Sequence, residues 1–291
     1  MDDGGKEIEK VLGQFHKRFL QSLQALNQRM AKAIPTIDLG APKFRSLADR
    51  IASINWEAVQ TKMDEFPQRS KEAMDIASAK GWFFAWTGSL REAYAVTDQL
   101  RSIDKEQVNE FMAEHYRSRV DCLSENLSKQ FPARAIAISA AVRAHKRADT
   151  DGYTLSIPVF IAQADGMISE ILGAVSALQK VGSKLTKQGA KEGETRAAYA
   201  LRNKVADEED LNYVNPILAL HDLDFLMNQG DRAASTQSSG GEFSALNRHQ
   251  VMHGEISDYG TELNSLRAFS FLCFVGLHLP AFLSWKGQDN V

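Results

Sequence analysis

One short window of this chain combines side chains that can cleave a phosphodiester without a metal ion. Residues 246–254 read Leu-Asn-Arg-His-Gln-Val-Met-His-Gly, which brings Arg248, His249 and His253 close together in sequence. Histidine exchanges a proton near neutral pH because its ordinary pKa is roughly 6.5. Arginine stays charged and presents a planar fork of donors that suits a phosphate. The window therefore holds the residue types that metal-independent cutting of RNA requires.

The spacing of these residues limits how they can meet on one helix. His249 and His253 are four positions apart and share a helix face. Arg248 and His253 are five apart, so on an ideal helix their directions diverge by roughly 140°. They could meet if Asn247 caps the helix and Arg248 reaches over its end, where free N–H groups favour a phosphate. They could also meet across a symmetric dimer, and the spacing does not choose between the two.

The wider pattern resembles the HEPN superfamily (higher eukaryotes and prokaryotes nucleotide-binding). Its signature is an arginine, a polar residue, three further residues and a histidine, which Arg248, His249 and His253 match. Three further segments resemble a recurrent arrangement in bacterial and phage proteins with a C-terminal HEPN-like domain: residues 153–158 (YTLSIP), 163–166 (QADG) and 258–262 (DYGTE). The resemblance covers about residues 131–285, a little over half of the chain.

The resemblance implies a helical bundle that forms a homodimer, with both Arg–His motifs lining one groove. It implies a metal-independent endoribonuclease of the kind found in toxin–antitoxin, abortive-infection and CRISPR-linked systems. His253 would act as general base or acid on a ribose 2′-hydroxyl, and Arg248 would hold the scissile phosphate. The product would carry a 2′,3′-cyclic phosphate. His249 occupies the polar position of the signature, where asparagine is common, and would affect fine positioning.

Partners follow from the same resemblance. RNA, a second copy of the chain, and an antitoxin or trigger are expected, and no cofactor is. The two histidines four positions apart could also suggest zinc, but a zinc-protease helix has glutamate directly after the first histidine. Here that residue is Gln250 and no third ligand is marked, so no metal site is expected.

Asp165 lies within an otherwise apolar helical pattern and has two interpretations. A buried carboxylate needs a partner, so Asp165 could orient Arg248 or a catalytic histidine. Alternatively, it faces water beside Gly166. The sequence leaves both interpretations open.

The same residues also allow a second interpretation, from a different class of protein. In it, the chain is a HEPN-like helical scaffold that binds a nucleotide or a protein partner and does not cleave RNA. The intact Arg248/His253 pair favours the ribonuclease, whereas the lack of a marked base-binding site favours the scaffold.

The composition of the chain limits how it can bind nucleic acid and where in the cell it is expected. The chain has 291 residues, 44% of them hydrophobic, and a net charge of −3, so any contact with nucleic acid must come from a local patch. Cys122 and Cys273 form no CxxC pair or disulfide framework, and no apolar signal peptide opens the chain, which predicts a cytoplasmic protein. The nearly apolar stretch 268–285 predicts a buried terminal helix rather than a membrane span, because no basic cluster flanks it.

Hydrophobic periodicity predicts an all-α protein with no sheet of consequence. Helices are predicted over residues 8–30, 44–54, 55–79 with a break at Pro67, 82–100, 105–129 with Asp104 as N-cap, 133–147, 153–181 with Pro158 in the first turn, 215–227, around Arg248/His253, and after Thr261. A turn is predicted at residues 150–152 and a Gly/Ser-rich loop at 228–242.

Phe131-Pro132 marks the predicted domain boundary. Residues 1–130 would form an N-terminal helical domain. Its function is not indicated by the sequence, and our hypothesis is that it senses a trigger or binds a partner. Residues 131–291 would form the HEPN-like helical domain.

Overall fold

The computed structural model of the chain describes residues 55–85, 90–205, 208–220, 223, 225–226 and 246–287. The chain divides into two compact units, residues 1–60 and 61–291. Of the first unit only the start of one helix is described, so the fold below is that of the second. The described part is all-α and contains no strand, as predicted; its β-structure is one isolated antiparallel bridge between Lys180 and Thr195.

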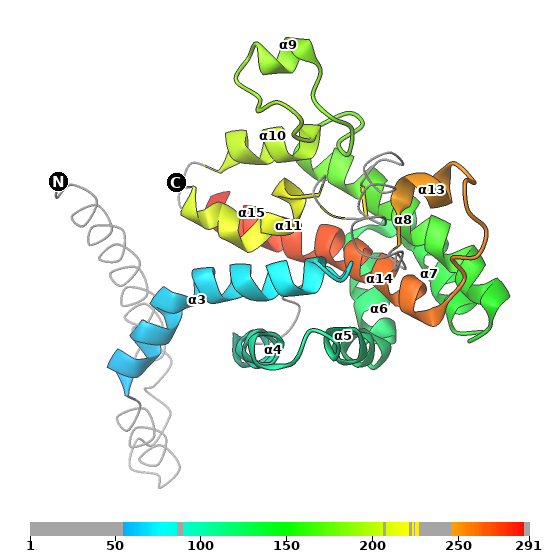
Figure 1. Cartoon of the computed structure of the whole chain (residues 1–291), viewed down its shortest axis with the longest axis horizontal. Coiled ribbons are helices and arrows are strands. Elements are labelled where there is room, and N and C mark those ends of the chain that lie inside the picture. Colours follow the sequence, from blue (N-terminus) through cyan, green and yellow to red (C-terminus); the bar gives the residue numbers. More distant parts are fainter. Residues whose placement is uncertain are drawn as a thin grey trace, which may run out of the picture. The chain divides into compact units, whose positions relative to one another are not determined.

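The helices of the described part vary from single turns to long rods (Figure 1). They are α3 (Trp56–Ser78), α4 (Leu90–Ser102), α5 (Val108–Arg117), α6 (Val120–Gln130), η2 (Pro132–Arg134), α7 (Ala135–His145), α8 (Thr150–Leu172), α9 (Ser183–Thr186), α10 (Arg196–Lys204), η3 (Glu209–Val214), α11 (Asn215–Leu218), α13 (Arg248–Met252), α14 (Glu262–Cys273), η4 (Phe274–His278) and α15 (Leu279–Gly287). The helices predicted at 8–30 and 44–54 and the loop predicted at 228–242 lie outside the described residues.

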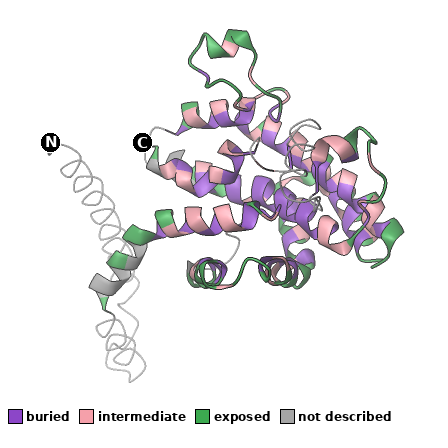
Figure 2. Cartoon of the chain, viewed as in Figure 1, coloured by how far each residue is buried: buried purple, intermediate pink, exposed green. Residues whose placement is uncertain are grey.

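The core forms around α14 and η4, which continue into one another. Every residue from Ser265 to Gly276 is buried (Figure 2). Helix α8 packs against both α7 and α14, and the ring of Phe160 on α8 lies 5.3 Å from that of Phe269 on α14. This position explains the apolar run of the C-terminal helix over residues 268–276, which neighbouring helices cover on all sides.

Two helical stretches are long and apolar enough to cross a membrane by length and composition alone. They are Thr150–Leu172 and Glu262–Ser284, and 44% and 78% of their most apolar windows are buried inside the protein. Burial against other helices accounts for such composition in a core helix, so both stretches are compatible with a soluble protein.

The start of α8 differs from the prediction. Residues 150–152, predicted as a turn, form the first turn of the helix, because the Asp149 side chain caps it by accepting a hydrogen bond from Gly152 N at 2.6 Å. Pro158 consequently lies well inside the helix rather than in its first turn. The helix ends at Leu172, before Gly173, whose φ of 66° is left-handed. The true cap lies several residues upstream of the predicted start.

Three other predicted helices are shorter than expected, and the one predicted over residues 215–227 ends at Leu218. Residues 82–85 form no regular secondary structure, and α4 begins only at Leu90. The backbone of Phe83 bonds to side chains of other helices instead: its N–H donates to Ser270 Oγ at 3.1 Å and its carbonyl accepts from Tyr116. The predicted helix 105–129 is divided into α5 and α6, and the N-cap of α5 is Gln107 rather than Asp104. Pro67, by contrast, does not break α3.

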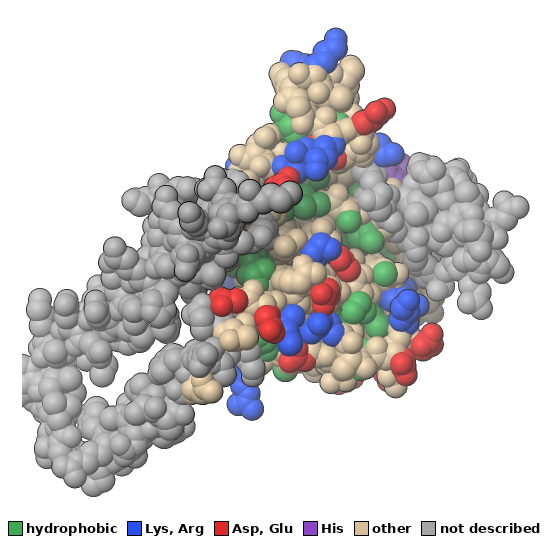
Figure 3. All heavy atoms as spheres, turned by 60° about the vertical axis from the view of Figure 1, so that its left-hand side comes forward, with side chains coloured by type: hydrophobic (Ala, Val, Ile, Leu, Met, Phe, Trp, Pro, Cys, Tyr) green, Lys and Arg blue, Asp and Glu red, His purple; other side chains and the backbone are tan. Residues whose placement is uncertain are grey.

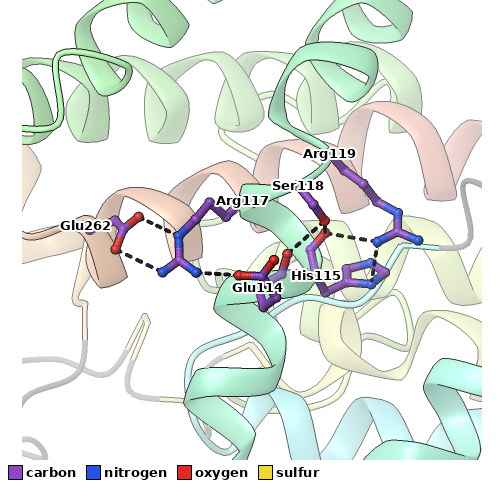
Figure 4. A network of polar contacts seen from close by, with 6 residues as sticks. All are labelled: Glu114, His115, Arg117, Ser118, Arg119 and Glu262. Carbon is purple, nitrogen blue, oxygen red and sulfur yellow. Dashed lines mark hydrogen bonds and ion pairs between the residues drawn. The ribbon is translucent and has the colours of Figure 1, made fainter.

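The predicted domain boundary at Phe131-Pro132 lies within the second unit, between α6 and α7. These two helices pack together, and α5 packs on α14. An ion pair adds to this contact: Arg117, at the end of α5, donates to both carboxylate oxygens of Glu262 at 2.8 and 3.0 Å (Figure 4). Residues 1–54 and 86–89 of the predicted N-terminal domain lie outside the described residues, so the boundary stays a prediction.

Candidate functional site

Helix α13 carries the Arg–His motif and consists of little more than one turn. Asn247 is its N-cap, as predicted, and the side-chain oxygen accepts a hydrogen bond from Gln250 N at 3.1 Å. Asn247 is fully buried, and Arg248 N donates to the carbonyl of Phe225 at 2.8 Å. Gly254, with a φ of +70°, ends the helix. Five residues generate only a small helix dipole, so a phosphate here would depend on side chains rather than on the helix end.

Arg248 and Asp165 form an ion pair between α13 and α8. Arg248 Nη2 lies 2.5 Å from Asp165 Oδ2, and their side chains are only 20% and 25% exposed. Of the two interpretations of Asp165, the structure has the one in which it contacts Arg248. The Nε of Arg248 is buried and has no hydrogen-bond partner among the described residues. Asp165 therefore directs the arginine, while part of the guanidinium keeps unused donors.

The two histidines of α13 lie side by side. The rings of His249 and His253 are nearly parallel, with centroids 6.0 Å apart. Burial lowers the pKa of His249, and the positive charges of Arg248 and His253 lower it further. His249 is therefore a neutral imidazole at neutral pH and can accept a proton. His253 is exposed at the end of the helix, where a substrate can reach it.

The residues 163–166 of α8 hold a second arginine that sequence reasoning missed. Arg134 Nη1 donates to Gln163 Oε1 at 3.1 Å, and its Nη2 pairs with Glu170 at 3.0 Å. A Cβ on Gly166 would lie 2.7 Å from Arg134 Nη1, so a larger residue there would push the guanidinium out of its present position. Of the QADG segment, Gln163 and Gly166 thus accommodate Arg134, and Asp165 holds Arg248. Nothing near Arg134 in the sequence signals this contact.

The segment that follows α13 is held close to α8. A Cβ on Gly260 would lie 2.1 Å from Thr154 Oγ1 and 2.9 Å from the carbonyl of Thr150, so the two backbones touch. Thr261 then caps α14 by accepting a hydrogen bond from Asn264 N at 3.2 Å. The chain is thus fixed to α8 both before the first histidine and after the second.

Charges of both signs share the protein surface. On the face shown in Figure 3, Lys and Arg side chains alternate with Asp and Glu side chains over the described part. Among the described residues, no group of three or more His, Cys, Asp or Glu side chains is placed to hold a metal ion. The side chains of α13 themselves can transfer a proton through imidazole and bind an anion through guanidinium.

Compared with known proteins, the chain matches no family model, no curated protein and no solved structure. The resemblance to HEPN proteins consequently depends on the residues of the motif and of the segments around it.

Proposed function

We propose that this protein is a metal-independent endoribonuclease of the HEPN type that works as a homodimer in the cytosol. The observation that supports it most directly is the arrangement around α13. Arg248, whose guanidinium pairs with a carboxylate, shares this short helix with two stacked imidazoles, one of which is exposed. These groups can bind a phosphodiester and move a proton, the two tasks of metal-free RNA cleavage.

In the proposed reaction a histidine removes the proton of a ribose 2′-hydroxyl, and the 2′-oxygen attacks the adjacent phosphorus. The bond to the 5′-oxygen breaks, that oxygen takes a proton, and a 2′,3′-cyclic phosphate remains. His253 carries the proton, and Arg248 stabilises the charge on the phosphate oxygens. Asp165 keeps Arg248 in position by occupying Nη2, while no hydrogen bond from Nη1 is formed among the described residues.

A homodimer would complete this arrangement. Arg248 is directed toward α8 by its ion pair, whereas His253 stacks with His249 and is exposed at the other end of the helix. An arginine and a histidine from two copies could then meet on one RNA strand, in a setting of phage defence or growth control with an antitoxin or trigger as the regulator.

The alternative function is a HEPN-like scaffold that binds a nucleotide or a protein partner without cutting. One observation favours it: the charge of Arg248 is already balanced by Asp165, as in a structural ion pair. The mixed charges on the face in Figure 3 add to this argument, because RNA binding depends on local positive potential.

The test is incubation of the purified protein with mixed cellular RNA in EDTA. Arg248→Ala and His253→Ala are compared with Gln250→Ala on the same helix and with Arg143→Ala, an exposed arginine of α7. Cleavage that resists EDTA, yields cyclic phosphate ends and disappears only in the first two variants supports the ribonuclease. Cleavage that persists in those variants refutes it. If the wild type cuts nothing and His253→Ala loses the dimer, the scaffold is the better description.

A further inference from the structure

A pocket of about 180 Å³ opens between α4, α5 and α6, on residues that the Arg–His cluster does not use. Its floor is apolar and buried, formed chiefly by Phe84, Val96 and Leu123. At roughly 30 Å³ for each water molecule, the volume corresponds to about six waters. It is smaller than the roughly 300 Å³ at which drug-sized sites begin, so it suits a small metabolite.

The rim of the pocket contains a guanidinium and an imidazole in contact. Arg119 Nη1 donates to the carbonyl of His115 at 3.2 Å and lies 3.4 Å from His115 Nδ1 (Figure 4). Because Nη1 is a donor, this contact assigns Nδ1 as the acceptor and Nε2 as the protonated nitrogen. The amide of Asn126 lines the same rim. The rim therefore offers several hydrogen-bond donors around one positive charge.

The charge state of His115 agrees with this geometry. Burial lowers the pKa of His115 to about 4, and the neighbouring Arg119 acts in the same direction. At neutral pH the imidazole is therefore neutral, and the guanidinium supplies the positive charge of the rim. Glu92 also lines the pocket and carries a negative charge. Glu92 would therefore repel a ligand with two negative charges more strongly than one whose single carboxylate binds Arg119.

We propose that this pocket is a binding site for a small carboxylic acid with a compact apolar body. The carboxylate binds Arg119 and Asn126, and the apolar body lies on Phe84, Val96 and Leu123. The site does not depend on the ribonuclease proposal, because none of its residues belongs to α8 or α13.

The chain contains its own reporter for the test. Cys122 is exposed and lines the pocket, whereas Cys273, the second of the two cysteines, is fully buried. Alkylation of the folded protein by iodoacetamide therefore modifies Cys122, and modification of Cys273 indicates unfolding. The probe is benzoate, with benzamide as its uncharged analogue and inorganic phosphate as an anion without an apolar body.

For so small a ligand we expect a dissociation constant on the order of millimolar, so about 10 mM benzoate should slow alkylation of Cys122 roughly tenfold. Benzamide and phosphate at the same concentration and ionic strength should slow it less than twofold. Arg119→Gln should abolish the protection, and Arg143→Gln should leave it intact. Resistance of Cys273 to alkylation and an unchanged circular dichroism spectrum identify folded variants.

Three results would overturn the proposal. Equal protection by benzamide would mean that the pocket binds apolar molecules whether or not they are charged. Equal protection by phosphate would mean that Arg119 binds any anion. No protection by benzoate in the folded wild type would mean that the pocket does not accept an aromatic carboxylate.

Discussion

Replacing Asp165 with asparagine removes the charge that holds Arg248 against α8 and changes the volume very little. Breaking a buried ion pair costs about 3–5 kcal/mol, and an exposed pair contributes about 0–1 kcal/mol. With side chains 20% and 25% exposed, this pair lies between the two limits. We expect Asp165→Asn to lower the free energy of unfolding by about 2 kcal/mol, because a mostly buried guanidinium loses the negative charge that balances it, although the amide oxygen can still accept a hydrogen bond.

The assay is a double-mutant cycle with Asp165→Asn, Arg248→Gln and the double variant, measured by urea unfolding. A direct pair should give a coupling energy of about 1–2 kcal/mol, since the second substitution has little left to break. Thermal unfolding should show Asp165→Asn melting roughly 4–8 °C below the wild type. The matched control is Glu170→Gln, which removes another carboxylate of α8 whose side chain is 62% exposed, and which should cost under about 1 kcal/mol.

Additive effects of the two substitutions would refute the reasoning. A coupling energy below about 0.5 kcal/mol would mean that Asp165 and Arg248 act independently in solution. RNA cleavage provides a second readout: if Asp165 positions Arg248, Asp165→Asn should reduce cleavage by roughly a hundredfold while RNA of the same length still binds.

Three further predictions concern the surroundings of the site. Gly260→Ala should lower the free energy of unfolding by about 1–3 kcal/mol, because the added Cβ would meet Thr154 Oγ1 at 2.1 Å. Gly254→Asn, in the same segment but with open space, should lower it by less than about 1 kcal/mol in urea unfolding, because asparagine tolerates the left-handed φ of +70° better than most residues do. Burial lowers the pKa of His278 to about 4, so as the pH drops this histidine takes up a proton in the unfolded state before it does so in the folded state. The free energy of unfolding should therefore fall by about 1.4 kcal/mol per pH unit from this residue between about pH 6.5 and pH 4. His278→Gln should reduce this slope, measured by urea unfolding at a series of pH values between 7.5 and 5. If RNA crosses α8, Arg134→Gln should weaken RNA binding and reduce by about one the slope of the logarithm of the binding constant against the logarithm of the salt concentration. Fluorescence anisotropy over a salt series measures this slope, and an unchanged slope would exclude Arg134 from the interface.

The fold class followed from the sequence because helix signals act over short distances. Periodic apolar residues and helix caps involve partners three or four positions away; Asn247 caps α13 as considered, and Thr261 caps the helix expected to follow it. The same reasoning overlooked the cap at Asp149, since a turn signal at residues 150–152 looked stronger. It also missed the non-helical segment 82–85, where the backbone of Phe83 bonds to side chains on distant helices.

Within the candidate site, the sequence by itself determined which side chains are present, how they are spaced on α13, and that Asn247 begins that helix. Only the tertiary structure decided their partners. Asp165 and Arg248 are 83 positions apart, and their contact depends on how α13 meets α8. The contact of Arg134 with Gly166 and the pocket beside Arg119 have the same origin. Local chain geometry sets a side chain's direction along its own helix, but the packing of neighbouring helices decides what it meets.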